Sequence, residues 1–207
     1  MKTSAENAPI GGRILPKYLD KLMGVRVLLI NSAFEANHEG ARSIAVSDID
    51  GLEVAIAVAR ATVPHKLTGK EIRFLRKALG MKATDLAHFL DVTPETVSRW
   101  ENDRERITTN AERVFRIKII TDLREKAMGV EAKLNTVVDM KFSPFRPSMV
   151  PTTLIFERVG AVVEGRREKI WLYQGISDED EEPGDEMPIA NLASVVGRAR
   201  RAPRRSS

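Results

Sequence analysis

The residues GMKATDLAHFLDVTPETVSRWE, which span positions 80–101, form the strongest pattern in the chain. Apolar residues recur at helical spacing in two short groups that lie on either side of Val92. Between the groups, Thr93 is a typical N-cap residue, and Pro94 stands where a first helical residue does not need its N–H. The pattern therefore predicts two short helices joined by a tight turn, and the second helix begins at Pro94.

Further helices are predicted on both sides of this pair. Thr68 precedes Glu71 by three residues, which is the spacing of a capping box at a helix N-terminus, and Gly80 is a natural end for that helix. After a polar loop at 102–106, repeated apolar residues predict a last helix. Residues 64–120 thus predict one helical domain of four to five helices.

A small α+β module is predicted before the helical domain. Alternating apolar residues indicate strands at 25–30 and 43–49, with a polar loop at 31–40 between them. Asp50 is the expected N-cap of a following helix, which Pro64 closes.

A short α+β segment is predicted after the helical domain. Two strands, at 152–158 and 169–173, are joined by a turn around Gly165. The predicted fold class is mainly α. The expected organisation is a flexible lead-in at 1–16, the α+β module at 17–63, the helical domain at 64–120, the α+β segment at 121–175 and a disordered tail at 176–207.

Composition limits the class of protein. The chain has no cysteine, which excludes disulfides, thiolate zinc sites and cysteine nucleophiles, and its three histidines are scattered without metal-site spacing. No apolar run reaches the roughly 18 residues needed to cross a bilayer, and the first residues lack the pattern of a signal peptide. We therefore expect a cytoplasmic protein with no cofactor and no membrane partner.

The net charge of +4 is compatible with a nucleic-acid partner but does not by itself indicate one. The charges of the tail are polarised: residues 178–186 are mostly acidic, and residues 198–205 carry five arginines. The basic cluster is typical of nonspecific phosphate binding.

The stretch at 80–101 resembles the phage-repressor-like (XRE) helix-turn-helix domains. The matching residues are Leu86, Ala87, Leu90, Val92 and Val97 to Glu101. Two positions depart from that family, because Ala83 stands where a glutamine is common and Lys82 where a Ser or Thr cap is usual. The resemblance implies that Trp100 is a core residue and that Glu101 forms an internal ion pair with Arg76.

A narrower resemblance covers the preceding helix. The sequence LTGKEIRFLRKALG, at 67–80, is similar to regulators related to MqsA-type antitoxins. In that group a small N-terminal module, often a zinc domain bound by cysteines, precedes the helix-turn-helix. The module at 17–63 stands in the matching place, but without cysteine the zinc function is not expected.

A helix in the DNA major groove presents its first turns to the base edges. Arg99 is suited to a bidentate bond with guanine, Glu95 to accepting from cytosine N4, and Thr96 to contact with a thymine methyl group or a phosphate. Flanking cations are expected to hold phosphates. The complete predicted DNA-binding set is Lys82, Thr93, Pro94, Glu95, Thr96, Ser98, Arg99, Arg104 and Arg106.

The predicted function is sequence-specific binding of double-stranded DNA by a transcriptional regulator, which represses its own or a neighbouring operon. The alternatives are an antitoxin that binds a toxin protein, and a mobile-element accessory protein. A homodimer is expected, built through 121–175 or 17–63, because one short helix reads few base pairs. No catalytic motif is found: Ser148 superficially matches the serine of self-cleaving repressors, but Arg146 and Pro147 precede it where those proteins have glycine and an acid, and we predict that the chain is not an enzyme.

Overall fold

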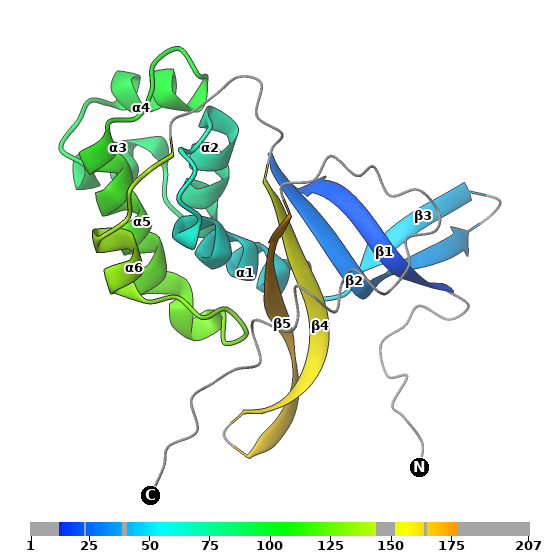
Figure 1. The fold of residues 1–207 in the computed structure, drawn as a ribbon. Helices are drawn as coiled ribbons and strands as arrows, with labels where there is room; N and C mark the ends of the chain where they lie inside the picture. The colour runs from blue at the N-terminus through cyan, green and yellow to red at the C-terminus, as the bar shows by residue number, and fades with distance from the viewer. Residues whose placement is uncertain (1–12, 23, 39–40, 144–151, 164, 178–207) are drawn as a thin grey trace, which may run out of the picture.

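The computed structural model describes residues 13–22, 24–38, 41–143, 152–163 and 165–177. Within these residues the chain forms six α-helices, one 3-10 turn and one five-stranded sheet. The helices lie on one side of the sheet. The hairpin formed by residues 153–177 belongs to the sheet, and its tip projects beyond the helices and the other strands (Figure 1).

The sheet draws on both ends of the chain. Its strands are β1 (Arg13–Leu22), β2 (Val25–His38), β3 (Ala41–Val46), β4 (Thr153–Val163) and β5 (Arg166–Ser177). The order is β1-β2-β4-β5, and β3 also pairs with β2. The β2–β4 pair is parallel, from Arg26↔Thr153 to Ile30↔Glu157, while the other pairs are antiparallel.

The prediction of a mainly α fold is confirmed only in part, because the helix-turn-helix domain forms as expected but is accompanied by this five-stranded sheet. Strands were predicted at 25–30 and 152–158, but their parallel pairing was not, since nothing local in the sequence reports a contact across more than a hundred residues. The pairing joins the N-terminal module and the C-terminal segment in one sheet. The fold is α+β, with a mixed sheet beside a helical domain.

Two more corrections concern β1 and β2. Strand β1 begins at Arg13, inside the segment that the sequence predicts as a flexible lead-in. Strand β2 continues through residues 31–38, which the sequence predicts as a loop because they are polar. Pairing with β1 and β3 satisfies the backbone there, and Asn31 takes a left-handed conformation (φ 48°) within the strand.

The helices confirm most of the local signals. They are α1 (Ile49–Thr62), α2 (Gly69–Ala78), α3 (Ala83–Phe89), α4 (Pro94–Glu101), α5 (Thr109–Leu123) and α6 (Leu134–Val138), with the 3-10 turn at Arg124–Lys126. The capping box is present. The Glu71 carboxylate accepts from the Thr68 backbone N–H at 2.7 Å, and the Thr68 hydroxyl accepts from the Glu71 backbone N–H at 3.4 Å. The N-cap of α1, however, is Asp48 and not Asp50.

Helix α1 lies between the sheet and the other helices (Figure 1). It contacts β4 and β5 on one side, and α2, α5 and α6 on the other. Leu52 and Ile56 of α1 and Val27 and Leu29 of β2 are completely buried in one continuous core. The helical domain thus packs against the sheet through α1.

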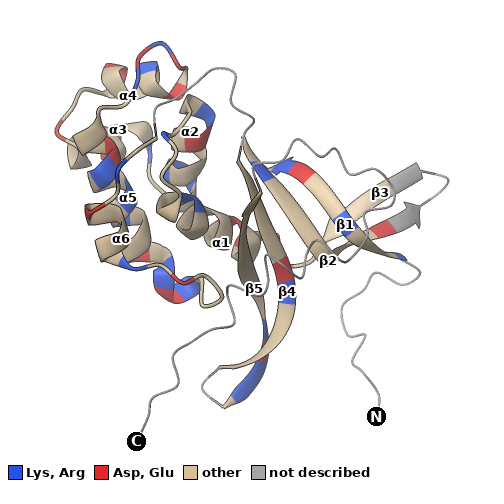
Figure 2. Ribbon diagram, in the orientation of Figure 1, with Lys and Arg blue, Asp and Glu red and all other residues tan. Residues whose placement is uncertain are grey.

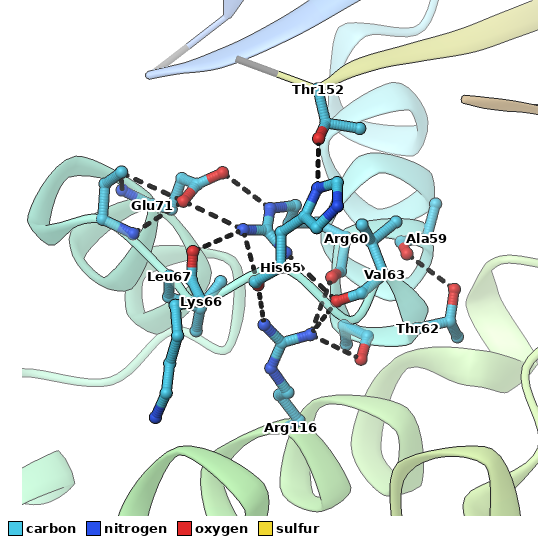
Figure 3. Close-up of polar contacts among 12 residues, drawn as sticks. Ala59, Arg60, Thr62, Val63, His65, Lys66, Leu67, Glu71, Arg116 and Thr152 are labelled. Atoms are coloured by element: carbon cyan, nitrogen blue, oxygen red, sulfur yellow. Dashed lines mark hydrogen bonds and ion pairs between the residues drawn. The ribbon is translucent and has the colours of Figure 1, made fainter. Parts of the chain in front are cut away.

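A network of buried charged residues stabilises the helical domain at the end of α1 (Figure 3). Arg60, at the end of α1, binds Glu71 of α2, with 2.6 Å between Nε and Oε1. Arg116 of α5 binds Glu112 at 2.7 Å, and both side chains are fully buried. Burial, followed by the nearby charge of Arg60, lowers the pKa of Arg116 to about 10, so the side chain remains a cation at neutral pH.

The two arginines converge on the linker between α1 and α2. Both guanidinium groups donate to the carbonyls of Val63 and His65. The His65 ring, which the sequence predicts at the surface, is partly buried and lies 2.5 Å from the Thr152 hydroxyl, just before β4. The linker therefore connects three parts of the fold, and this arrangement holds the helical domain in one position relative to the sheet.

Candidate nucleic-acid interface

Helices α3 and α4 meet at a tight turn, as the sequence predicts. Asp91 takes a left-handed conformation (φ 54°), and the Val92 N–H donates to the Ala87 carbonyl at 3.0 Å. Val97 and Trp100 are buried at 0% and 2% exposure, which confirms their inward direction. Helix α4 therefore turns one side into the core and the other towards solvent.

The solvent side of α4 contains most of the predicted base-reading residues. Thr93, Pro94, Glu95, Ser98 and Arg99 are exposed, and Thr96 is half-buried. The Thr93 hydroxyl accepts from the Thr96 backbone N–H at 3.2 Å, so Thr93 is the N-cap and its oxygen is already engaged. Its predicted contact with DNA would have to share that oxygen.

Glu95 is a fully exposed anion in the first turn of α4. Hydrogen bonds from its own backbone N–H and from the Thr93 side chain, with a smaller attraction from Arg99, lower its pKa. The carboxylate is therefore ionised at neutral pH and is an acceptor only. It can accept from a cytosine amino group but repels a phosphate.

The predicted phosphate-binding residues are also exposed. Lys82 lies just before α3, and Arg104 and Arg106 lie in the loop between α4 and α5. The Lys82 side chain does not cap α3; instead the Asp85 carboxylate accepts from the Lys82 backbone N–H at 2.7 Å. The Lys82 ammonium group therefore takes no part in capping α3.

Carboxylates accompany the cations of this surface, which the sequence analysis did not predict. The Arg106 guanidinium lies 3.0 Å from Asp103, and Arg99 Nη1 lies 3.8 Å from Glu105 Oε2. Figure 2 shows acidic and basic residues intermixed over α4 and the loop that follows. Two of the predicted DNA contacts therefore already face a carboxylate in the free protein.

The predicted ion pair between Arg76 and Glu101 is confirmed. Arg76 Nε lies 2.6 Å from Glu101 Oε1, and Arg76 also donates to the Met81 carbonyl at 2.7 Å. A second cation, Arg73, lies 3.1 Å from the other carboxylate oxygen of Glu101 and also bonds Asn102 at 3.1 Å. Arg73 was missed, although its position three residues before Arg76 places it on the same side of α2.

The start of α2 fits closely against the end of α4. A Cβ atom on Gly69 would lie 2.5 Å from the Trp100 carbonyl oxygen, so only glycine allows this approach. The Gly69 N–H also donates to Asp103 at 2.9 Å. Helix α4 is thereby held at its C-terminal end by α2, while Pro94 and Glu95 at its N-terminal end are exposed.

Residues 72–117 match a family model described as helix-turn-helix. The match runs from α2 into α5 and includes the whole α3–turn–α4 unit. No curated protein and no solved structure matches the chain. The segment is a helix-turn-helix domain, a class that binds DNA through its second motif helix, here α4.

No helix among the described residues is long and apolar enough to cross a membrane. The same residues contain no group of three or more His, Cys, Asp or Glu side chains placed to hold a metal ion.

Proposed function

We propose that the protein is a sequence-specific regulator that binds double-stranded DNA through α4 and represses its own or a neighbouring operon. The observation that carries this proposal is the position of α4. Glu101 and Gly69 fix its C-terminal end, while the side that bears Thr96 and Arg99 is open to solvent. A major groove admits one such helix.

In this proposal Arg99 is the principal base-reading residue. Its guanidinium is exposed at the end of a rigid helix, and a bidentate arginine–guanine contact discriminates by about 1–3 kcal/mol. Glu95 and Thr96 read neighbouring bases. Lys82, Arg104 and Arg106 bind phosphates and contribute affinity more than selectivity.

A homodimer belongs to the same proposal, because a single helix of eight residues reads few base pairs. Strands of the segments 17–63 and 121–175 lie in one sheet, and we propose that this shared sheet makes the dimer contact. The outer edge of β5 is already engaged at Tyr173, whose N–H donates to Gly129 at 3.0 Å. We therefore place the contact elsewhere on the sheet, and light scattering of the free chain tests it.

An antitoxin is the second candidate. This candidate rests on the resemblance of residues 67–80 to regulators related to MqsA-type antitoxins, because the exposed apolar residues of the sheet do not establish a contiguous patch. The most exposed of them are Val162 at 71% and Ile14 at 53%. Co-purification with the product of an adjacent gene would favour the antitoxin over a repressor that acts alone. Binding at attachment sites instead of a promoter would favour the other alternative, a mobile-element accessory protein.

The decisive experiment begins by selecting preferred duplexes from a random library with the full chain. Affinities of the wild type and of Arg99→Ala are then measured on a selected duplex and on its scrambled version, at two salt concentrations. We expect Arg99→Ala to weaken binding to the selected duplex about ten- to a hundred-fold and to affect the scrambled duplex much less. Arg124→Ala, which removes an exposed arginine from the 3-10 turn, is the matched control.

Equal weakening on both duplexes would reduce Arg99 to a phosphate contact. If the library yields no preferred sequence, the proposal of sequence-specific binding is wrong. Removal of the tail arginines from Arg198 onward should instead lower affinity for all duplexes alike and flatten the salt dependence.

A further inference from the structure

We propose that Glu105 is a positioning residue that orients Arg99 for base reading and raises the selectivity of the domain. The inference rests on the proposed DNA-binding function and adds a residue that the sequence analysis did not include. Three features carry it: the way the loop folds back on α4, the ion pair itself, and the edge of the guanidinium that the pair leaves free.

The loop after α4 folds back on the residue that it would orient. The backbone N–H groups of Arg104 and Glu105 both donate to the Arg99 carbonyl, at 2.9 and 3.4 Å. Asp103 makes the turn in a left-handed conformation (φ 54°), and its carboxylate accepts from the Gly69 N–H at 2.9 Å. The backbone of Glu105 therefore has a defined place relative to Arg99.

The Glu105 side chain uses this place to contact Arg99. Its Oε2 lies 3.8 Å from Arg99 Nη1, and the two side chains are 48% and 62% exposed. An ion pair this exposed contributes little to folding stability. Its attraction becomes stronger when a bound duplex excludes water, because the local dielectric constant falls.

The geometry leaves the reading edge of Arg99 available. A guanidinium has five N–H donors, and the contact between Glu105 and Arg99 is at Nη1. The Nε–Nη2 edge remains for the O6 and N7 acceptors of guanine. A carboxylate at Nη1 thus restricts the rotamers of Arg99 without occupying the donors that guanine needs.

The same carboxylate discourages nonspecific contacts. An unrestrained arginine on this surface would reach the nearest phosphate, whereas Glu105 repels phosphates and holds the cation towards the groove. Glu105 should therefore lower the affinity for random DNA while supporting the affinity for a preferred sequence. The ratio of the two affinities is the quantity that it controls.

Glu105→Gln tests the inference because it removes the charge and keeps the shape. Affinities of the full chain are measured on a duplex selected from a random library by the wild type, and on that duplex with the guanine read by Arg99 replaced. We expect the affinity ratio to fall about three- to tenfold and random-sequence binding to strengthen. Glu125→Gln, which removes an exposed charge from the 3-10 turn, should leave the ratio unchanged.

A second comparison separates positioning from simple repulsion. In an Arg99→Ala background, Glu105→Gln should no longer change the affinity ratio, although it should still strengthen binding to all duplexes. If Glu105→Gln strengthens binding to both duplexes equally in the wild-type background, Glu105 only repels phosphates and the inference is overturned. Failure of the proposed function looks different, since the wild type itself would then show no preferred duplex.

Discussion

Replacement of Glu101 by glutamine should destabilise the helix-turn-helix domain, because this carboxylate joins α2 to α4. Glu101 is 6% exposed at its side chain and faces two cations, Arg76 and Arg73, at 2.6 and 3.1 Å. Glutamine keeps the shape, but it loses the charge and turns an amide donor towards guanidinium donors. The two arginines would then face a neutral group from which water is largely excluded.

The two partners differ in burial, and this sets the magnitude. Arg76 is 12% exposed and makes two hydrogen bonds to Glu101. Loss of this partly buried, charged contact is expected to lower the free energy of unfolding by about 2–4 kcal/mol. Arg73 is 46% exposed, and its bond to Glu101 is expected to contribute about 0–1 kcal/mol. We therefore expect Glu101→Gln to lower the free energy of unfolding by about 2–4 kcal/mol, and Tm by roughly 4–16 °C.

Urea unfolding and calorimetry of Glu101→Gln, Arg76→Gln and Arg73→Gln measure these effects. Arg76→Gln should be nearly as destabilising as Glu101→Gln, while Arg73→Gln should change stability by less than about 1 kcal/mol. The reasoning is refuted if Glu101→Gln leaves Tm unchanged, or if the two arginine variants are equally destabilising. DNA binding should weaken together with stability, since α4 loses the contact that orients it.

Two further predictions concern the same domain. Gly69→Ala should destabilise by about 1–3 kcal/mol, since its Cβ would lie 2.5 Å from the Trp100 carbonyl, whereas Gly160→Ala, with no atom within 4 Å of the added Cβ, should be nearly neutral. Burial opposes ionisation of Glu71, but the charge of Arg60 and hydrogen bonds from Arg60 and Thr68 outweigh it and lower the pKa below the usual 4.5. The resulting stability is present above about pH 4.5 and lost as the pH falls through the folded-state pKa, so urea unfolding from pH 6 to pH 3 should show a smaller loss for Glu71→Gln than for the wild type.

The helix-turn-helix was predictable from the sequence because its signals are local. Thr68 and Thr93 mark helix starts through capping bonds that span three residues, and helical spacing marks Val97 and Trp100 as buried. The pair of Arg76 with Glu101 was predictable only because the stretch resembles a known family. The structure confirms all of these features.

The mixed sheet was decided by tertiary structure alone. Pairing of residues 26–30 with 153–157 depends on backbone bonds between segments that the whole helical domain separates in the chain. A separate pairing, with β1 and β3, draws residues 31–38 into a strand despite their polar composition, because these two strands satisfy their backbone groups. Propensity reports what a segment prefers when isolated, and here the neighbours outweighed it.

The charges of the DNA-facing surface also depended on the folded chain. The sequence marked Arg99 and Arg106 as cations on or beside α4, and it placed Asp103 and Glu105 in a polar loop. In the folded chain that loop turns back on α4 and donates hydrogen bonds to the Arg99 carbonyl. This path of the backbone places a carboxylate beside each of the two arginines. A residue's type is local information, but its partner is chosen by the path of the backbone around it.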